Sequence, residues 1–229
     1  MEKAGRLYGI GVGPGDPELM TLKAVRTIKV CPVIAAPRTE GGRMLALEIA
    51  AGCADLAGKT ILPLDFPMQR DEAERQATRR RAADALEAIL RDGEDAAFLT
   101  LGDVSVYSTF GYVAEILRSR GYETERIPGV PSFCAAAACL DEDLAEGREQ
   151  LHILPAGTES LGEALRLPGT KVVMKSKGLG TLTAALRENG RLERAALVQD
   201  CGLAGERICR NLTEDAPDGG YFTTVIVKE

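Results

Sequence analysis

Short apolar runs alternate with longer amphipathic segments along most of the chain. Runs rich in Val, Ile, Leu and Ala predict buried strands, and segments with apolar residues every three or four positions predict helices. Regular alternation of the two is typical of α/β folds with parallel sheets. The predicted strands are Leu7–Val12, Pro32–Pro37, Thr60–Leu64, Asp95–Leu101, Glu123–Ile127, Gln150–Leu154, Lys171–Lys175 and Ala195–Asp200. The predicted helices are Pro17–Val30, Met44–Ala51, Asp71–Arg91, Phe110–Arg120, Ser132–Leu140, Leu161–Leu167 and Leu179–Glu188.

The pattern changes near the end of the sequence. Glu206–Arg210 and Tyr221–Lys228 have no helical segment between them, so we expect two antiparallel edge strands there. The acid-rich stretch Asp141–Glu149 is typical of a domain boundary. We therefore expect two Rossmann-like α/β domains with mixed sheets, residues 1–143 and 144–229. The first would carry a glycine-rich loop and the substrate cleft.

Glycines crowd the end of the first predicted strand, at positions 9, 11, 13 and 15. Without side chains they allow a ligand to approach the backbone closely. The spacing does not match Gly-x-Gly-x-x-Gly, the pattern of dinucleotide-binding loops. Pro14 lacks the N–H that a phosphate would need, and Asp16 places a negative charge at the start of the next helix, where it is suited to be the N-cap. The loop therefore suits a ligand that is not anionic at this point.

Two further motifs follow predicted strands of the first domain. Leu101-Gly-Asp-Val-Ser-Val-Tyr-Ser-Thr109 follows one strand, and Pro128-Gly-Val-Pro-Ser132 follows another. Ligands of open α/β sheets bind beyond the carboxyl ends of the strands. Three glycine-containing strand ends therefore predict one shared pocket.

Composition excludes several other functions. The net charge is −6 and aromatic residues make up 4% of the chain, which disfavours nucleic-acid binding. No apolar run is long enough to span a membrane, and the first residues do not resemble a signal peptide. The six cysteines contain no Cys-x-x-Cys pair, so we expect mostly buried thiols, no protein-bound metal and a cytoplasmic location.

The three motifs together resemble those of the tetrapyrrole methyltransferases, two-domain enzymes of corrin and siroheme synthesis. The resemblance extends to Val172-Val-Met-Lys175 and Leu197-Val-Gln-Asp-Cys201 in the second half. Within the family, the second motif and Phe66-Pro-Met68 are most similar to the precorrin-2 (or cobalt-factor II) C(20)-methyltransferases of cobalamin biosynthesis. Val104 departs from the family, which often has proline there.

The resemblance implies a reaction and its participants. S-adenosyl-L-methionine would be the methyl donor and a tetrapyrrole the acceptor, with the second domain completing the donor site and the protein forming a homodimer. The donor-binding residues implied by the resemblance are Pro14, Leu101, Gly102, Asp103, Val106, Pro131, Ser132, Met174 and Cys201. The family often has Ser or Thr where Pro131 stands, so this residue would contribute only shape or backbone contacts.

For the tetrapyrrole we expect contacts with Tyr107, Ser108 and Thr109 of the second motif, and with Arg38 after the second strand. Tyr107 could orient the macrocycle or move a proton, or it could be a core residue. Guanidinium groups bind carboxylates in a bidentate manner, which suits the acetate and propionate groups of the substrate. The arginines at 70, 75, 79, 80 and 81 could do the same, or they could form a solvated helix face.

Structural roles are the alternative for several other residues. Met174, Cys201 and the single histidine, His152, could each be a packing residue. Three rival functions also remain open at this point. They are another tetrapyrrole methyltransferase, such as the uroporphyrinogen III enzyme; diphthine synthase, which would need a surface to dock a large protein partner; and a non-catalytic nucleotide or metabolite sensor. A dinucleotide sensor would need an acid after the second strand to bind ribose, and the sequence there is Ala35-Ala-Pro-Arg38.

Overall fold

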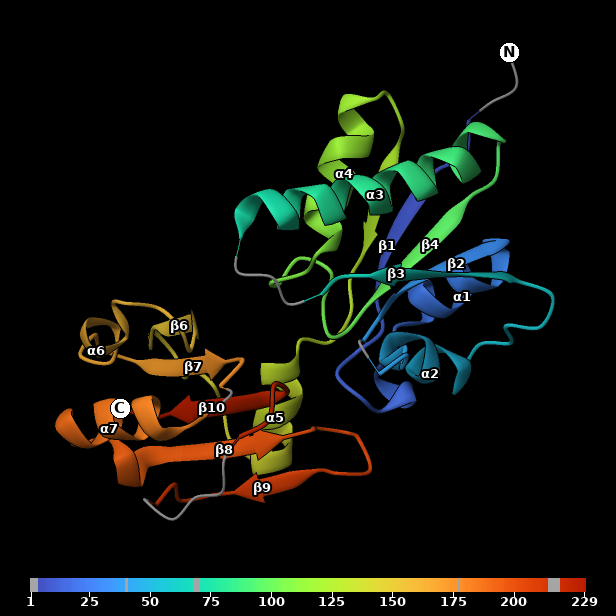
Figure 1. Ribbon diagram of the computed structural model, residues 1–229. Coiled ribbons are helices and arrows are strands. Elements are labelled where there is room, and N and C mark those ends of the chain that lie inside the picture. The colour runs from blue at the N-terminus through green and yellow to red at the C-terminus, as the bar shows by residue number, and fades with distance from the viewer. Residues whose placement is uncertain (1–3, 40, 68–70, 177, 214–218) are drawn as a thin grey trace. The chain divides into compact units, whose positions relative to one another are not determined.

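The computed structural model describes residues 4–39, 41–67, 71–176, 178–213 and 219–229, and it divides into two compact units (Figure 1). The units are Met1–Pro131 and Ser132–Glu229, and each contains one five-stranded sheet. The predicted α/β class with two sheets is therefore confirmed. The division falls before the expected position at residue 143, because helix α5 (Ser132–Leu140) packs on strands of the second sheet.

The first unit is built on a parallel sheet with the strand order β3-β2-β4-β1-β5. Its strands are β1 (Leu7–Gly11), β2 (Val33–Arg38), β3 (Thr60–Asp65), β4 (Ala96–Thr100) and β5 (Thr124–Ile127). Its helices are α1 (Leu22–Val30), α2 (Leu45–Ala51), α3 (Glu72–Arg91) and α4 (Phe110–Ser119), with a 3-10 turn, η1, at Pro17–Leu19. The strand and helix segments of this half follow the predicted order closely.

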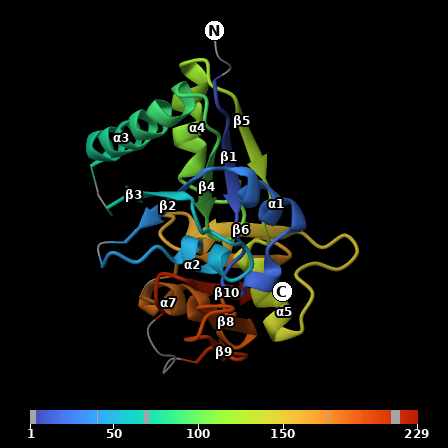
Figure 2. The same ribbon diagram turned by 90° about the vertical axis from the view of Figure 1, so that its right-hand side faces the viewer.

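Helices cover both faces of the first sheet, as a parallel sheet requires. Figures 1 and 2 show α3 and α4 on one face and α1 and α2 on the other. The ring of Phe98 on β4 lies between those of Phe66 and Phe110, with centroids 6.2 and 5.7 Å away. On α3, Ala82, Leu86 and Leu90 are buried in this core and Ile89 packs against it.

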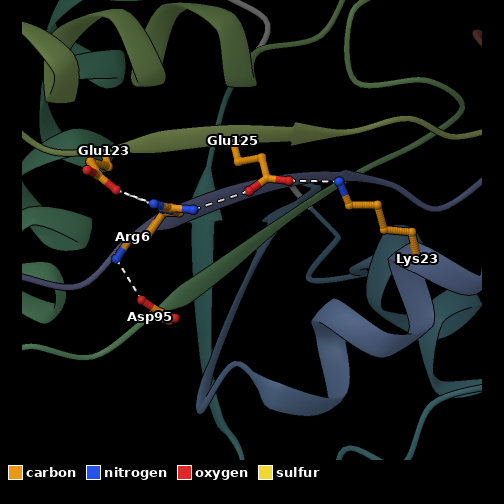
Figure 3. Close-up of polar contacts among 5 residues, drawn as sticks. All are labelled: Arg6, Lys23, Asp95, Glu123 and Glu125. Carbon is orange, nitrogen blue, oxygen red and sulfur yellow. Dashed lines mark hydrogen bonds and ion pairs between the residues drawn. The ribbon is translucent and has the colours of Figure 1, made fainter.

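Ion pairs join the amino ends of the same strands (Figure 3). Arg6 bonds the Glu123 carboxylate through its guanidinium and donates its backbone N–H to Asp95 at 2.7 Å. Glu125 lies between Arg6, 3.4 Å away, and Lys23, 2.8 Å away. These charged groups lie at the amino ends of the strands, opposite the glycine motifs. Their ion pairs therefore connect parts of the first unit away from the carboxyl edge of the sheet.

The second unit is built on a mixed sheet with the order β6-β7-β10-β8-β9. Its strands are β6 (Leu151–Pro155), β7 (Thr170–Met174), β8 (Ala195–Gln199), β9 (Arg207–Cys209) and β10 (Thr223–Val227). Besides α5, its helices are α6 (Leu161–Ala164) and α7 (Gly180–Glu188), with a 3-10 turn, η2, at Leu192–Arg194. Figure 1 shows α7 against the sheet formed by β7, β10 and β8, and the apolar residues of α6 and α7 share one buried cluster with these strands.

Two details of the prediction were wrong. The segment near the end of the chain was expected to be an edge strand, but β10 is central, antiparallel to both β7 and β8, and buried along its whole length. Of the two expected edge strands, β9 alone is at an edge. The helix predicted from Pro17 is divided in two: Asp16 caps η1, accepting from the N–H of Glu18 at 2.9 Å, whereas Thr21 caps α1.

Among the described residues, no helix combines the length and the apolar character that crossing a membrane demands.

Three glycines allow the loops after β1, β4 and β5 to come into backbone contact. A Cβ atom on Gly11 would lie 2.6 Å from the carbonyl oxygen of Gly102 and 2.7 Å from the nitrogen of Gly129. A Cβ atom on Gly129 would lie 2.3 Å from the same carbonyl oxygen. Real side chains do not come this close to backbone atoms, so larger residues at positions 11 and 129 would separate the loops.

Gly129→Ala should destabilise the first unit by about 3 kcal/mol, near the upper end of overpacking costs, because the obstructing atoms belong to backbone that cannot rotate away. The matched control is Gly111→Ala on α4, where a Cβ atom would meet only the Arg126 side chain at 3.9 Å. Alanine favours helix there, so the control should be neutral or stabilising by up to about 1 kcal/mol. Urea denaturation of both variants measures the difference. Equal stabilities would show that the loops separate at little cost.

Candidate active site

The glycine motifs are connected by hydrogen bonds as well as by contact. Gly102 donates its N–H to the carbonyl of Gly13 at 2.8 Å, and Gly13 donates back at 3.2 Å. Both glycines have positive φ, 64° for Gly102 and 78° for Gly13, a conformation that L side chains rarely adopt. The first and second motifs thus form one small antiparallel bridge at the carboxyl edge of the sheet.

The Asp103 carboxylate connects the second motif to the third. One oxygen accepts from the backbone N–H of Ser105 at 2.8 Å and from its hydroxyl, and the other accepts from the N–H of Gly129 at 2.9 Å. Asp103 is 8% exposed. Burial raises the pKa of its carboxyl, but the hydrogen bonds from Ser105 and from the backbone of Gly129 outweigh burial and keep the pKa below its usual range. Asp103 is therefore an ionised structural link, whose oxygens already have protein donors before any ligand binds.

The Tyr107–Thr109 segment follows this link and leads into α4. Tyr107 has φ 49°, and its side chain is 44% exposed, so it is not a core residue. A non-glycine residue in this backbone region is energetically costly and often marks a functional site. Ser108 uses its hydroxyl to accept from the N–H of Phe110 at 3.1 Å and to contact the Thr100 hydroxyl at 3.2 Å. Thr109 precedes the helix without a capping side-chain hydrogen bond.

The other first-unit residues expected to bind the donor lie along the same loops. Pro14 and Leu101 flank the Gly13–Gly102 bridge in sequence, Val106 lies beside Tyr107, and Pro131 is the last residue of the third motif before α5. All four are half-buried, so each retains some accessible surface. The first-unit residues that we expect to bind the donor therefore lie in the loops at the carboxyl edge of one sheet.

The remaining expected donor residues belong to the second unit. Ser132 is the first residue of α5, Met174 is the last residue of β7, and Cys201 follows β8. Ser132 and Met174 are half-buried and Cys201 is 8% exposed. Met174 thus lies at a strand end, and Cys201 is a buried residue two positions after the end of β8. His152, by contrast, has a structural contact with the carbonyl of Pro168 at 2.9 Å.

Arg38 lies at the carboxyl end of β2, but it already has a partner. Its Nε and Nη2 atoms donate to the two oxygens of Asp65 at 2.9 and 2.7 Å, a bidentate pair between adjacent strand ends. The hydrogen bond from Arg38 lowers the pKa of Asp65. Asp65 was not among the predicted site residues, and it would compete with any other anion for the same nitrogen atoms of Arg38.

The arginines of α3 mostly contact their own helix. Arg75 and Arg79 both pair with Glu72, at 2.7 and 2.9 Å, and the Arg79 guanidinium lies 3.7 Å from the centre of the Tyr112 ring. Arg81 donates to the Thr78 hydroxyl at 2.9 Å. These contacts favour a structural role for this helix face. Arg70 and Met68 lie outside the described residues.

The cysteines differ from the expectation. Only Cys31 and Cys201 are buried, whereas Cys53 and Cys134 are exposed and Cys139 and Cys209 are half-buried. Burial raises the pKa of the Cys31 thiol to about 12. Cys139 and Cys201, far apart in sequence, have their sulfur atoms 3.5 Å apart. No spacing rule could have found this pair, because the contact arises from the packing of α5 against the loop after β8.

Comparison of the sequence with known proteins shows which family this chain belongs to. The family model of the Tetrapyrrole (Corrin/Porphyrin) Methylases matches residues 6–217. The chain is 37% identical to the probable cobalt-precorrin-2 C(20)-methyltransferase of Methanocaldococcus jannaschii, covering 97% of this chain and 96% of that protein. It is 33% identical to the cobalt-precorrin-2 C(20)-methyltransferase of Salmonella typhimurium, covering 98% and 97%. It is also 31% identical to the precorrin-2 C(20)-methyltransferase of a Sinorhizobium species, covering 97% and 95%.

Solved structures agree with this assignment. A cobalt precorrin-4 methyltransferase superposes with a TM-score of 0.76 at 20% identity, covering 97% of this chain and 94% of that one, and so shows the fold. The uroporphyrin-III C-methyltransferase of Thermus thermophilus, complexed with S-adenosylhomocysteine, gives 0.70 at 25% identity, covering 98% of both chains. The chain belongs to the tetrapyrrole methylases, a family of S-adenosylmethionine-dependent enzymes.

Asp103→Asn should destabilise the protein by about 1–3 kcal/mol, because the amide group keeps one acceptor but turns an N–H toward either Ser105 or Gly129. The pKa of Asp103 is lowered in the folded protein, so its contribution is complete above the usual carboxyl pKa of about 4 and is lost as the pH falls through the folded value. The stability difference between wild type and variant should therefore shrink in acid. Urea titrations at neutral and acidic pH measure it, and a difference independent of pH would contradict the link.

Proposed function

We propose that this protein transfers a methyl group from S-adenosyl-L-methionine to carbon 20 of precorrin-2 or of its cobalt-containing counterpart, in cobalamin synthesis. The observation that carries the proposal is the 37% and 33% identity to two C(20)-methyltransferases over nearly the whole of both chains. Both of these relatives are described as acting on cobalt-precorrin-2, which favours the cobalt-containing substrate. The half-buried residues along the glycine-motif loops support a ligand site at the carboxyl edge of the first sheet.

The proposed reaction needs little general acid or general base catalysis from the protein. A sulfonium donor is already activated, and the receiving carbon of a reduced tetrapyrrole is electron-rich, so the transfer is an in-line displacement. The protein must align carbon, methyl and sulfur, which can lower the barrier by about 7–11 kcal/mol. A chain with one histidine and with fixed glycine loops suits this mechanism. The proposed transfer requires no bound metal.

Each site residue then has a proposed role. The loops carrying Pro14, Leu101, Gly102, Val106 and Pro131 would hold the donor through backbone and apolar contacts, with Asp103 fixing their mutual positions. Ser132, Met174 and Cys201 would contribute further donor contacts. Tyr107, held in its left-handed conformation, would orient the macrocycle or move a proton, and Ser108 and Thr109 would lie beside it.

A methyl-transfer assay tests the proposal directly. Purified protein with methyl-labelled donor should methylate precorrin-2 or cobalt-precorrin-2, and NMR should place the label on carbon 20. Uroporphyrinogen III serves as the competing acceptor. A label on another carbon, or transfer only to uroporphyrinogen III, would favour a different tetrapyrrole methyltransferase. Calorimetry that shows NAD binding as tightly as the donor, without transfer, would favour the sensor.

The Arg38–Asp65 pair provides variants with opposite expected effects. If Arg38 binds a substrate carboxylate, Arg38→Ala should weaken tetrapyrrole binding a few-fold at low salt. Asp65→Asn should strengthen it, because the variant removes a competing acceptor and a repulsive charge. Both effects should fade as salt screens the exposed groups, and donor affinity should not change.

Arg75→Ala is the matched control, since Arg75 is an exposed arginine paired with Glu72 on α3. Fluorescence titration with the tetrapyrrole measures all three variants. If Arg75→Ala lost affinity for the tetrapyrrole and Arg38→Ala did not, the result would indicate that the substrate binds near α3 and not near Arg38.

We also expect a homodimer, because two small units expose much surface relative to their volume and because dimers are typical of the family that the sequence resembles. Light scattering at micromolar concentration should give about twice the 24.4 kDa of the chain. A mass equal to one chain would contradict this expectation.

A further inference from the structure

A cluster of two thiols and a carboxylate lies in the second unit, and two of its three members, Cys139 and Glu206, have no task in the proposed methyl transfer. Cys139 is in the last turn of α5, and Cys201 and Glu206 flank the loop between β8 and β9. The two sulfur atoms are 3.5 Å apart, and the Cys139 sulfur is 3.6 Å from Oε2 of Glu206. All three potential ligand atoms lie within 4.8 Å of one another.

Two of these distances, those from the Cys139 sulfur, are close to the edges of a zinc tetrahedron. With Zn–S bonds of about 2.3 Å and Zn–O bonds of about 2.0 Å, tetrahedral angles place two sulfur ligands about 3.8 Å apart and a sulfur and an oxygen about 3.5 Å apart. The observed separations of 3.5 and 3.6 Å differ from these values by no more than a small side-chain rotation. Three protein ligands would leave the fourth position open to water or another ligand.

Surrounding groups hold the ligands in position. The backbone N–H of Gly202 donates to Oε2 of Glu206 at 2.8 Å, which orients the carboxylate toward the thiols. Arg210 donates to the backbone carbonyls of Leu140 and Cys139, the latter at 3.4 Å. Two thiolates, one carboxylate and Zn²⁺ would together carry one negative charge, which the adjacent guanidinium would offset.

We propose that Cys139, Cys201 and Glu206 bind a thiophilic divalent cation, Zn²⁺ in the first instance, through Cys201 and two residues that the proposed methyl transfer does not use. Binding exchanges two thiol protons for two Zn–S bonds, so each bound cation releases two protons to solvent. The cation would join α5 to the β8–β9 loop.

The test uses the full-length protein, stripped with a chelator and kept under a non-thiol reductant. Competition with a chromophoric chelator should show one Zn²⁺ per chain. Co²⁺ in its place should give a thiolate-to-metal charge-transfer band, which carboxylate binding alone would not produce. Calorimetry in buffers of different ionisation enthalpy should show the proton release.

Cys139→Ser should weaken Zn²⁺ binding by more than about a hundredfold and abolish the charge-transfer band, because loss even of an outer partner of a metal ligand costs 10–100-fold. Glu206→Gln should weaken binding while keeping the band. Cys134→Ser, an exposed cysteine on the same helix, is the matched control and should bind as the wild type does. Circular dichroism checks that each variant is folded. No Zn²⁺ binding by the reduced wild type, or wild-type affinity in Cys139→Ser, would overturn the proposal.

Discussion

The first unit depends on the contact between the backbones of three loops at the carboxyl edge of its sheet. Gly11, Gly102 and Gly129 approach so closely that a single added carbon on Gly11 or Gly129 would overlap backbone atoms. The Asp103 carboxylate fixes this arrangement by accepting from both sides of it. Because the loops are held by backbone and by an ionised side chain, their shape is set before a ligand arrives. Preorganisation of this kind favours a reaction whose main requirement is alignment.

Much of this arrangement could be predicted from the sequence, because the responsible signals are local. Glycines after apolar runs mark strand ends, and parallel strands direct their carboxyl ends to one edge, so the convergence of three motifs follows without any knowledge of contacts. The role of Asp103 could not be predicted in the same way. Its partner Gly129 lies on another strand end, and only the register of β1 against β4 and β5 brings the two together. The Arg38–Asp65 pair was missed for the same reason.

The errors in the second half also have a physical origin. A short apolar segment after a turn looks the same in sequence whether it pairs on one side or on both, so the position of β10 between β7 and β8 was not predictable from periodicity. The contact between Cys139 and Cys201 depends on the packing of a helix against a loop, which leaves no pattern in either segment. The sequence therefore predicts the individual strands and helices better than it predicts which of them pair.

The central position of β10 also affects how the protein folds during synthesis. The ribosome releases β6, β7, β8 and β9 before Thr223–Val227, yet β7 and β8 are joined only through β10. The first sheet has no such delay, since all its strands precede Ser132 and it can close while the second half is still being translated. During that interval the edges of β7 and β8 that β10 later covers are unpaired, and unpaired edges of this kind can pair with other chains.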